Sequence, residues 1–179
     1  MTDMTHATEQ VRAYMARVPE SLVRYLEDEV LPQYDHFDPA HQRDHARSVM
    51  QRSMAMGAHY ADTDAGMLLT AAACHDLGLC EGRATHHLVS GRIVRADQRL
   101  RQWFDGAQIE VIAEAAEDHR ASADRAPRTI YGMIVAEADR LIDPLVSMRR
   151  AVQYGLANYP ELTREQHYQR MAAHLHDKR

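Results

Sequence analysis

The chain has 179 residues, of which 45% are hydrophobic, and this length and composition suit one domain with a sizeable buried core. The formal net charge of −5 is small and the acidic residues are spread along the chain, which argues against a nucleic acid polymer or an anionic membrane as a partner. Two cysteines are too few for a disulfide framework, and the sequence shows neither an export signal nor a bilayer-spanning apolar stretch. We therefore expect a single domain over residues 1–179, located in the cytoplasm.

Apolar residues recur at helical intervals along nearly the whole chain, and no convincing stretch alternates with a period of two. We therefore predict an all-α fold, a single-domain helical bundle. In chain order, we expect helices over residues 19–31, 38–57, 64–76, 85–100, 107–119 and 129–141, from 144 onward, and from 163 to the charged end of the chain, with residues 121–128 as a loop.

Several of these boundaries are predicted from residues that favour helix ends. Asp38, Asp64 and Thr85 are expected to be N-caps, and Pro39 is expected to be the first residue of the helix that follows Asp38. The helix that begins after Asp64 has almost no polar face, which predicts that it is buried. Gly78 is expected to adopt a left-handed conformation where this helix ends.

His75 and Asp76 stand together at the end of this apolar helix. Burying an imidazole and a carboxylate together requires a compensating partner, and a divalent metal is one such partner. Adjacent residues of a helix project about 100° apart, so both side chains can reach one ion only near the end of the helix, where the sequence places them. The alternative interpretation is a histidine hydrogen-bonded to a neighbouring carboxylate without any metal.

Further candidate ligands occur along a chain that has 12 histidines; they are His45, His86, His87, His119 and Asp139. Asp139 lies in an apolar segment, where a lone carboxylate is costly to bury, so it either pairs with an arginine or binds a metal. Imidazole and carboxylate ligands suit Fe, Mn, Zn, Ni or Co, and the lack of thiolate argues against a structural zinc site. His41, four residues before His45 on the same helix face, is either a helix-surface residue, a residue that supports the ligands, or an alternative ligand.

The order of these residues resembles that of the HD superfamily of metal-dependent phosphohydrolases, which carries a histidine (here His45), then the pair (His75 and Asp76), then an aspartate (Asp139). The superfamily's signature helix and turn is similar to AAACHDLGL, and the segment bearing its last aspartate is similar to AEADRL. More narrowly, an uncharacterised bacterial HD group is similar to the segments HHLVSG, EDHRAS and PRTIYGMIVAEADR. The resemblance covers nearly the whole chain and implies a helical bundle of the HD-domain type.

The resemblance also implies a ligand set. Superfamily members with four ligands, here His45, His75, Asp76 and Asp139, hold one metal, and members with two further histidines between the pair and the last aspartate hold two. His86, four residues before the small residue Ser90, and His119 match these further positions, with His87 as the alternative to His86. We therefore expect two divalent transition metals bridged by Asp76, with a single metal as the alternative.

The activity implied by the resemblance is hydrolysis of a phosphate ester or anhydride in a small phosphorylated metabolite or nucleotide. His75 and Asp76 would form the catalytic centre, and Asp76, Glu137 or Asp118 would orient the attacking water. A diiron oxygenase of the same superfamily and a non-catalytic ligand-binding HD module are the alternatives.

Three arginines in loops or at helix ends stand near the candidate ligands and are expected to bind substrate phosphate: Arg83, Arg120 and Arg128. Arg120 directly follows His119 and is the preferred one of the three. A homo-oligomer with an even number of protomers is also expected.

Overall fold

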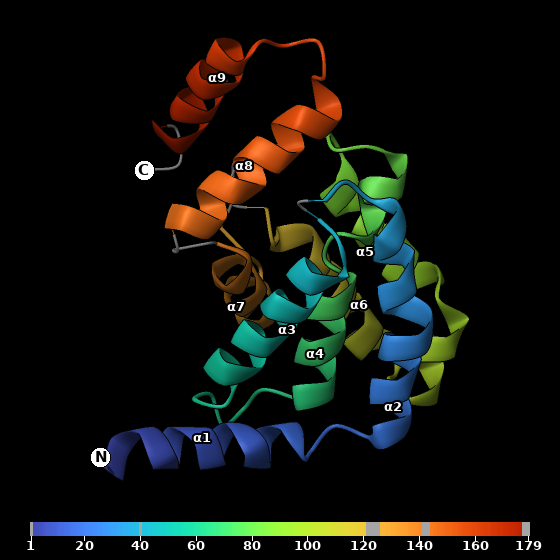
Figure 1. The fold of residues 1–179 in the computed structure, drawn as a ribbon. Helices are drawn as coiled ribbons and strands as arrows, with labels where there is room; N and C mark the ends of the chain where they lie inside the picture. The colour runs from blue at the N-terminus through green and yellow to red at the C-terminus, as the bar shows by residue number, and fades with distance from the viewer. Residues whose placement is uncertain (1, 40, 121–125, 141–143, 177–179) are drawn as a thin grey trace.

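The computed structural model describes residues 2–39, 41–120, 126–140 and 144–176. Over these residues every regular element is helical, which confirms the predicted all-α class (Figure 1). The elements are α1 (Thr2–Met15), α2 (Glu20–Tyr25), η1 (Leu26–Val30), η2 (Leu31–His36), α3 (Arg43–Gly57), α4 (Ala65–Cys74), η3 (Leu77–Glu81), α5 (His86–Ala96), η4 (Gln98–Gln102), α6 (Gly106–Asp118), α7 (Ile130–Asp139), α8 (Pro144–Asn158) and α9 (Arg164–His176).

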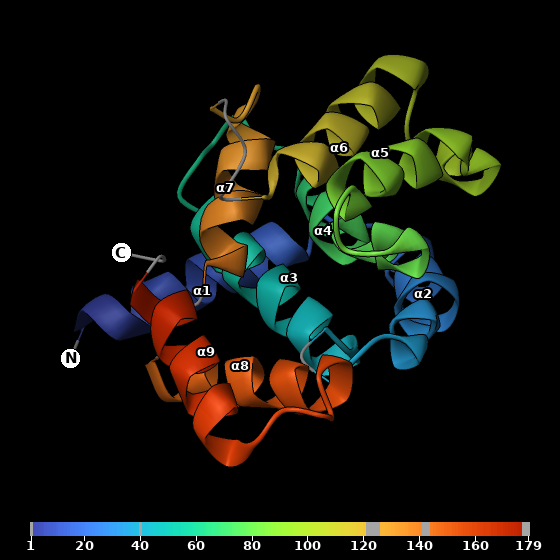
Figure 2. The ribbon, with the colours of Figure 1, turned by 90° about the horizontal axis from the view of Figure 1, so that it is seen from above.

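Helix α4 forms the centre of the core, because it packs against α3, α6 and α7 and every one of its residues is buried. Helices α5 and α6 pack against each other on one side of it. Helix α1 and the antiparallel pair α8 and α9, the α8–α9 hairpin, lie at opposite ends of the molecule (Figure 1). Seen from above, the hairpin lies beside the N-terminal end of α3 (Figure 2).

The capping residues explain where the central helices begin. The side chain of Asp64 accepts a hydrogen bond of 2.8 Å from the amide of Met67, which confirms the predicted N-cap of α4. Helix α6 begins with a capping box in which Asp105 and Gln108 each accept a hydrogen bond from the other's backbone amide. These caps satisfy amides at the start of each helix that have no partner within the helix.

Other predicted boundaries are wrong by a few residues. Helix α3 begins at Arg43 rather than near Asp38, because the Asp38 carboxylate contacts the His41 ring at 2.8 Å and no longer serves as a cap. His41 therefore precedes the helix and is buried, not a helix-surface residue. Thr85 makes no side-chain capping bond, and α5 ends at Ala96 instead of near residue 100.

The predicted helix over residues 19–31 is divided into three pieces. A short α-helix passes into a π-helical turn and then into the 3-10 helix η2. Pro32 does not stop the helical chain but occupies the first turn of η2, where a missing N–H costs nothing. Helix α1 was not predicted.

Gly78 does not adopt the expected left-handed conformation; among the described residues, only Gly82 has a positive φ, at 98°. Gly78 matters for another reason. A Cβ at this position would clash with the backbone carbonyl of His86, so glycine allows η3 to pack directly on the start of α5.

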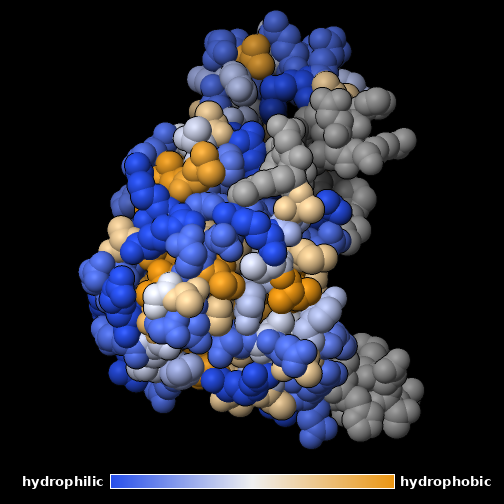
Figure 3. Space-filling model, turned by 180° about the vertical axis from the view of Figure 1, so that it is seen from behind, coloured by the Kyte–Doolittle hydropathy of each residue, from blue (hydrophilic) through white to orange (hydrophobic). Residues whose placement is uncertain are grey.

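Within the described parts of the chain, no helix combines the length and the hydropathy needed to cross a bilayer. On the face opposite to that of Figure 1, hydrophobic residues occur in small groups separated by hydrophilic ones (Figure 3). The exposed large hydrophobic side chains include Met133, Leu156 and Tyr60.

Candidate metal centre

The ends of five helices bring the predicted ligands together. His45 lies in the first turn of α3, His86 opens α5, and Asp139 closes α7, while His75 and Asp76 directly follow α4 and His119 directly follows α6. Except for Asp139, all of these residues are buried. Two triads could each hold a metal ion: His45, His75 and Asp76, and Asp76, His86 and His119.

Asp76 is common to both triads and divides its two oxygens between them. Its Oδ2 lies 3.5 Å from Nε2 of His45 and 3.3 Å from Nε2 of His75. Its Oδ1 lies 3.4 Å from Nε2 of both His86 and His119. This division of its oxygens would allow the carboxylate to contact a cation in each triad.

The orientation of the rings is fixed by backbone carbonyls behind them. Nδ1 of His75 contacts the carbonyl oxygen of Ala72 at 2.7 Å, Nδ1 of His86 contacts that of Arg83 at 2.7 Å, and Nδ1 of His119 contacts that of Ala116 at 2.6 Å. Since a carbonyl only accepts, each Nδ1 must be the donor, and each Nε2 is left to face the centre. Metal-binding histidines are usually held in this way.

The Nε2 atoms face one another at short range. Those of His86 and His119 are 3.1 Å apart, and those of His45 and His75 are 3.2 Å apart. Two neutral imidazoles whose lone pairs meet at this distance repel each other unless a proton or a cation lies between them. The donor set therefore fits a metal in each triad.

Asp139 adds a second carboxylate to the first triad. Its Oδ1 lies 3.1 Å from Nε2 of His45 and 4.0 Å from Nε2 of His75. Its side chain is 29% exposed, so the centre opens to solvent on this side. Asp139 would thereby add a fourth ligand to the first triad, whereas the second triad consists of three residues.

The charges of the centre are strongly coupled. Burial alone would lower the pKa of His75, but the charge of Asp76 and its hydrogen bond outweigh burial and raise this pKa to about 9. Burial would raise the pKa values of Asp76 and Asp139, yet neighbouring histidines lower both. In contrast, burial lowers the pKa of His86 to about 4. Because Nδ1 of His75 already donates to Ala72, a second proton on this ring would lie on Nε2, where a metal would bind, and metal binding would displace it.

Tyr34 contacts the backbone next to His75 and Asp76, and no sequence pattern indicated this role. Its hydroxyl donates to the carbonyl oxygen of Ala73 at 2.8 Å and accepts from the amide of Asp76 at 3.2 Å. The side chain is fully buried. Tyr34 therefore fixes the backbone where α4 ends and the two ligands begin.

The structure favours His86 over its neighbour. The Nε2 atom of His86 reaches Asp76, while the His87 ring lies beside that of His86 with 5.7 Å between the ring centroids. Ser90, the small residue four positions after His86, accepts a hydrogen bond of 2.9 Å from the amide of Gly78. The small side chain thus belongs to the contact between η3 and α5.

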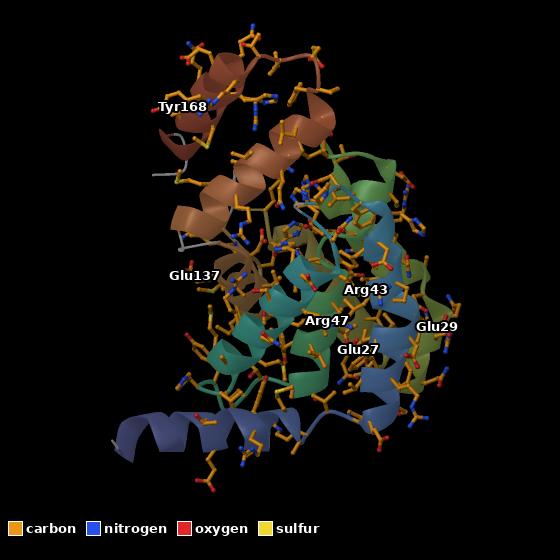
Figure 4. The ribbon with its side chains drawn as sticks, in the orientation of Figure 1. Glu27, Glu29, Arg43, Arg47, Glu137 and Tyr168 are labelled. Atoms are coloured by element: carbon orange, nitrogen blue, oxygen red, sulfur yellow. The ribbon has the colours of Figure 1, made fainter. Side chains whose placement is uncertain are left out.

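Glu137, predicted as a catalytic carboxylate, lies on the outer side of α7 (Figure 4). Residues of a helix are about 100° apart, so Glu137 and Asp139 point to nearly opposite sides. The Glu137 carboxylate pairs with Arg140 at 3.1 Å and lines a surface pocket with Met56 and Met133. This position does not support the catalytic role predicted for Glu137.

Arg128 and Asp118 form an ion pair with each other. The guanidinium of Arg128 lies 2.9 Å from Asp118, 2.6 Å from Glu117 and 3.2 Å from Glu114. Three carboxylates neutralise its charge, so the structure does not support the substrate role predicted for Arg128, nor a free carboxylate at Asp118. Arg120 donates to the carbonyl oxygen of Ala84 at 2.7 Å, which ties the end of α6 to the loop before α5.

Arg83 differs, because its side chain reaches toward the centre. Its Nη1 lies 3.1 Å from Nε2 of His41, and its guanidinium carbon lies 4.8 Å from the centroid of the Tyr154 ring. The His41 ring is 6.0 Å from that of His45. No sequence signal assigned Tyr154 to the site, because its approach to Arg83 depends on how the α8–α9 hairpin folds back.

Comparison with known proteins agrees with this geometry. The model of the HD domain family matches residues 43–142, more than half of the chain. The searches of curated proteins and of solved structures gave no match. The matched segment contains every residue of the two triads as well as Asp139. The chain therefore belongs to the HD domain family, a family of metal-dependent phosphohydrolases whose domains bind divalent metals.

Proposed function

We propose that this protein is a two-metal phosphohydrolase that cleaves a phosphate ester or anhydride in a small phosphorylated metabolite or nucleotide. The observation that supports it most directly is the division of the Asp76 carboxylate, with one oxygen toward His45 and His75 and the other toward His86 and His119. A carboxylate shared in this way is suited to hold two cations close together. Membership of the HD domain family supports a metal-dependent phosphohydrolase, and the Asp76 geometry adds support for two metals.

Metal ions at such a centre would acidify a water molecule and neutralise charge that develops on a phosphoryl oxygen. The side chains of the chain supply the geometry. Asp76 would bridge the ions, with His45, His75 and Asp139 on one side and His86 and His119 on the other. The carbonyl oxygens behind the rings keep the imidazoles fixed, so little reorganisation accompanies binding. Arg83 is the arginine best placed to bind the phosphoryl group of the substrate.

Metal analysis of the purified protein tests the stoichiometry. We expect two transition metal ions per chain, from among Fe, Mn, Zn, Ni and Co. His119→Gln should lower the content to about one, and Asp76→Asn should deplete both ions. His59→Gln is the matched control, since His59 is exposed and lines the surface pocket that also contains Glu137.

A phosphate-release screen over nucleotides and sugar phosphates tests the reaction. We expect metal-dependent release that chelation abolishes and that His119→Gln strongly reduces. Two iron ions per chain with oxygen consumption and no phosphate release would instead indicate the oxygenase alternative. Stoichiometric metal without either reaction would indicate a ligand-binding module.

Three further expectations still depend on the sequence alone. They are the single-domain extent of residues 1–179, the cytoplasmic location and the even-numbered homo-oligomer. A small phosphorylated partner, rather than a nucleic acid polymer or a membrane, belongs to the same proposal.

A further inference from the structure

Beside the metal centre, Asp38, His41, Arg83 and Tyr154 form a connected group. Nδ1 of His41 contacts Asp38 Oδ2 at 2.8 Å, and its Nε2 lies 3.1 Å from Nη1 of Arg83. Since the guanidinium can only donate, Nε2 of His41 accepts, and Nδ1 donates to the carboxylate. The Tyr154 ring covers the guanidinium at 4.8 Å and meets the His41 ring edge-on at 6.3 Å. Arg83 is thus held from two directions.

The side chains that contact Arg83 do not neutralise its positive charge. Arg95 and Arg128 each pair with carboxylates, among them the buried Glu117. Arg83 contacts a neutral imidazole and an aromatic ring instead, and among the described residues no carboxylate lies within ion-pair distance of it. Its positive charge is therefore available to an anion.

The position of Arg83 relates it to both triads. Its carbonyl oxygen accepts the hydrogen bond from Nδ1 of His86, and its side chain contacts His41, whose ring lies against that of His45. Arg83 therefore contacts His86 of the second triad through its backbone and His41, the neighbour of His45 of the first triad, through its side chain. A guanidinium in this place can donate to an anion that also faces the metals.

Tyr154 comes from a part of the chain that the family model does not cover. The model ends at residue 142 and contains every candidate ligand, whereas His41 and Tyr154 lie outside it. Helix α8 is held against α9 at Gly155, where a Cβ would clash with the Arg170 guanidinium and lie 2.9 Å from Nδ1 of His167. The adjacent Tyr154 projects toward Arg83. The candidate metal ligands thus lie within the segment that the family model matches, while the residues that surround Arg83, which are Asp38, His41 and Tyr154, lie outside it.

We propose that Tyr154 and His41 are positioning residues that hold Arg83 beside the metal centre as the binding site for the phosphoryl group of the substrate, so that the α8–α9 hairpin completes the active site. This inference rests on the proposed function. A ring against one face of a guanidinium fixes its plane and leaves the N–H groups at its edge free to donate. Without the ring, the exposed and flexible Arg83 side chain would lose entropy on binding each anion.

Binding of inorganic phosphate to the metal-loaded protein, measured by calorimetry, tests the inference without relying on turnover. Arg83→Gln should weaken binding by about tenfold or more. Tyr154→Leu should weaken it roughly threefold to tenfold, and Tyr154→Phe should weaken it less because the ring remains. His41→Leu should act in the same direction as Tyr154→Leu. In the double variant of Arg83 and Tyr154, the two effects should not add.

Turnover gives a second measurement. With a phosphate ester that the protein hydrolyses, Tyr154→Leu should raise KM by about the factor seen for phosphate binding, with a smaller change in kcat. Metal content should equal that of the wild type. Tyr168→Leu is the matched control, because Tyr168 lies on α9 of the same hairpin, is 61% exposed and points away from the centre (Figure 4).

The outcomes separate this inference from the proposed function. If Arg83→Gln weakens phosphate binding while Tyr154→Leu does not, or if Tyr154→Leu and Tyr168→Leu behave alike, the inference is overturned and the hydrolase assignment stands. A metal-loaded wild type that binds no phosphate overturns it as well. Phosphate binding that depends on Arg83 and Tyr154 in a protein that hydrolyses no phosphate ester supports the binding site and contradicts the proposed function.

Discussion

Gly78 lies so close to the carbonyl oxygen of His86 that a Cβ at position 78 would clash with it and would lie 2.6 Å from the amide nitrogen of Ser90. The Gly78 amide also donates to the Ser90 hydroxyl. Gly78 follows His75 and Asp76 by only a few residues, and His86 opens α5. This contact therefore sets the spacing between the two halves of the metal centre.

Gly78→Ala should destabilise the fold and disturb the second triad. The clash is with backbone, which cannot rotate away, so we expect a loss of about 3 kcal/mol in the free energy of unfolding. Since α5 must move, His86 should leave Asp76 and the metal content should fall toward one ion per chain. Chemical denaturation and metal analysis measure the two effects.

The control for this substitution is Gly106→Ala at the start of α6. Nothing lies within 4 Å of a Cβ at that position, so the free energy of unfolding should change by no more than about 0.5 kcal/mol. Equal behaviour of the two alanine variants would show that the close approach at Gly78 does not constrain the centre.

Two residues predicted as N-caps should differ in their contribution to stability. Asp64 accepts a hydrogen bond from Met67, so Asp64→Ala should cost about 1 kcal/mol. Thr85 has no side-chain capping bond, and Thr85→Ala should cost less than half as much. The midpoints of urea denaturation compare the variants, and a larger loss at Thr85 would contradict the assignment.

The residue pattern predicted much of the core and the triads, because the relevant information is local. The apolar run of α4 requires burial, and a polar pair at its end requires a partner. The resemblance of the residue order to the HD superfamily then implied His45, His119 and Asp139 as further ligands, and the structure brings all three to Asp76 or its neighbours.

The remaining features depend on contacts between distant segments. Asp38 followed by Pro39 reads locally as a helix start, but the Asp38 carboxylate binds the His41 ring instead. Glu137 is in the segment that resembles the family's last aspartate, yet the helix turns it away from Asp139. Tyr154 meets Arg83 only through the packing of α8. No local pattern distinguishes such residues from ordinary surface positions.

Glu117 should make stability depend on pH in the acid range. Burial alone would raise the pKa of Glu117, but hydrogen bonds from Arg95 and Arg128 outweigh it and lower this pKa below the ordinary 4.5. A lowered pKa in the folded state contributes stability that is present above pH 4.5 and is lost as the pH falls through the lowered value. Glu117→Gln should therefore cost about 2 kcal/mol at pH 7 and progressively less below pH 4.5.

Denaturation of wild type and Glu117→Gln across this pH range measures the effect. Glu110→Gln is the control, because Glu110 also pairs with Arg95 but its side chain is 52% exposed. Its loss should stay below about 1 kcal/mol. A difference between wild type and Glu117→Gln that stays constant from pH 7 into the acid range would contradict the linkage.

Arg52 should affect the stability of the fold and metal binding at the first triad only, which contains His45, His75 and Asp76. Its Nε donates to the carbonyl oxygen of Ala138 at 2.6 Å, which joins α3 to the last turn of α7. Asp139 follows directly and contributes favourably to the charged state of this arginine. Removing the guanidinium in Arg52→Met leaves the Ala138 carbonyl without this donor and should cost about 1 to 2 kcal/mol of stability.

The same substitution should weaken metal binding selectively, because Asp139 contacts His45 and His75 but not the other pair of histidines. We expect calorimetric titration of Arg52→Met to show one ion bound as in the wild type and the other bound more weakly. Arg47→Met, on the same helix and paired with Glu27 at a partly exposed site (Figure 4), should leave both affinities unchanged. Equal weakening of both ions by Arg52→Met would contradict this prediction, because it would show that α7 also positions His119 through its packing against α6.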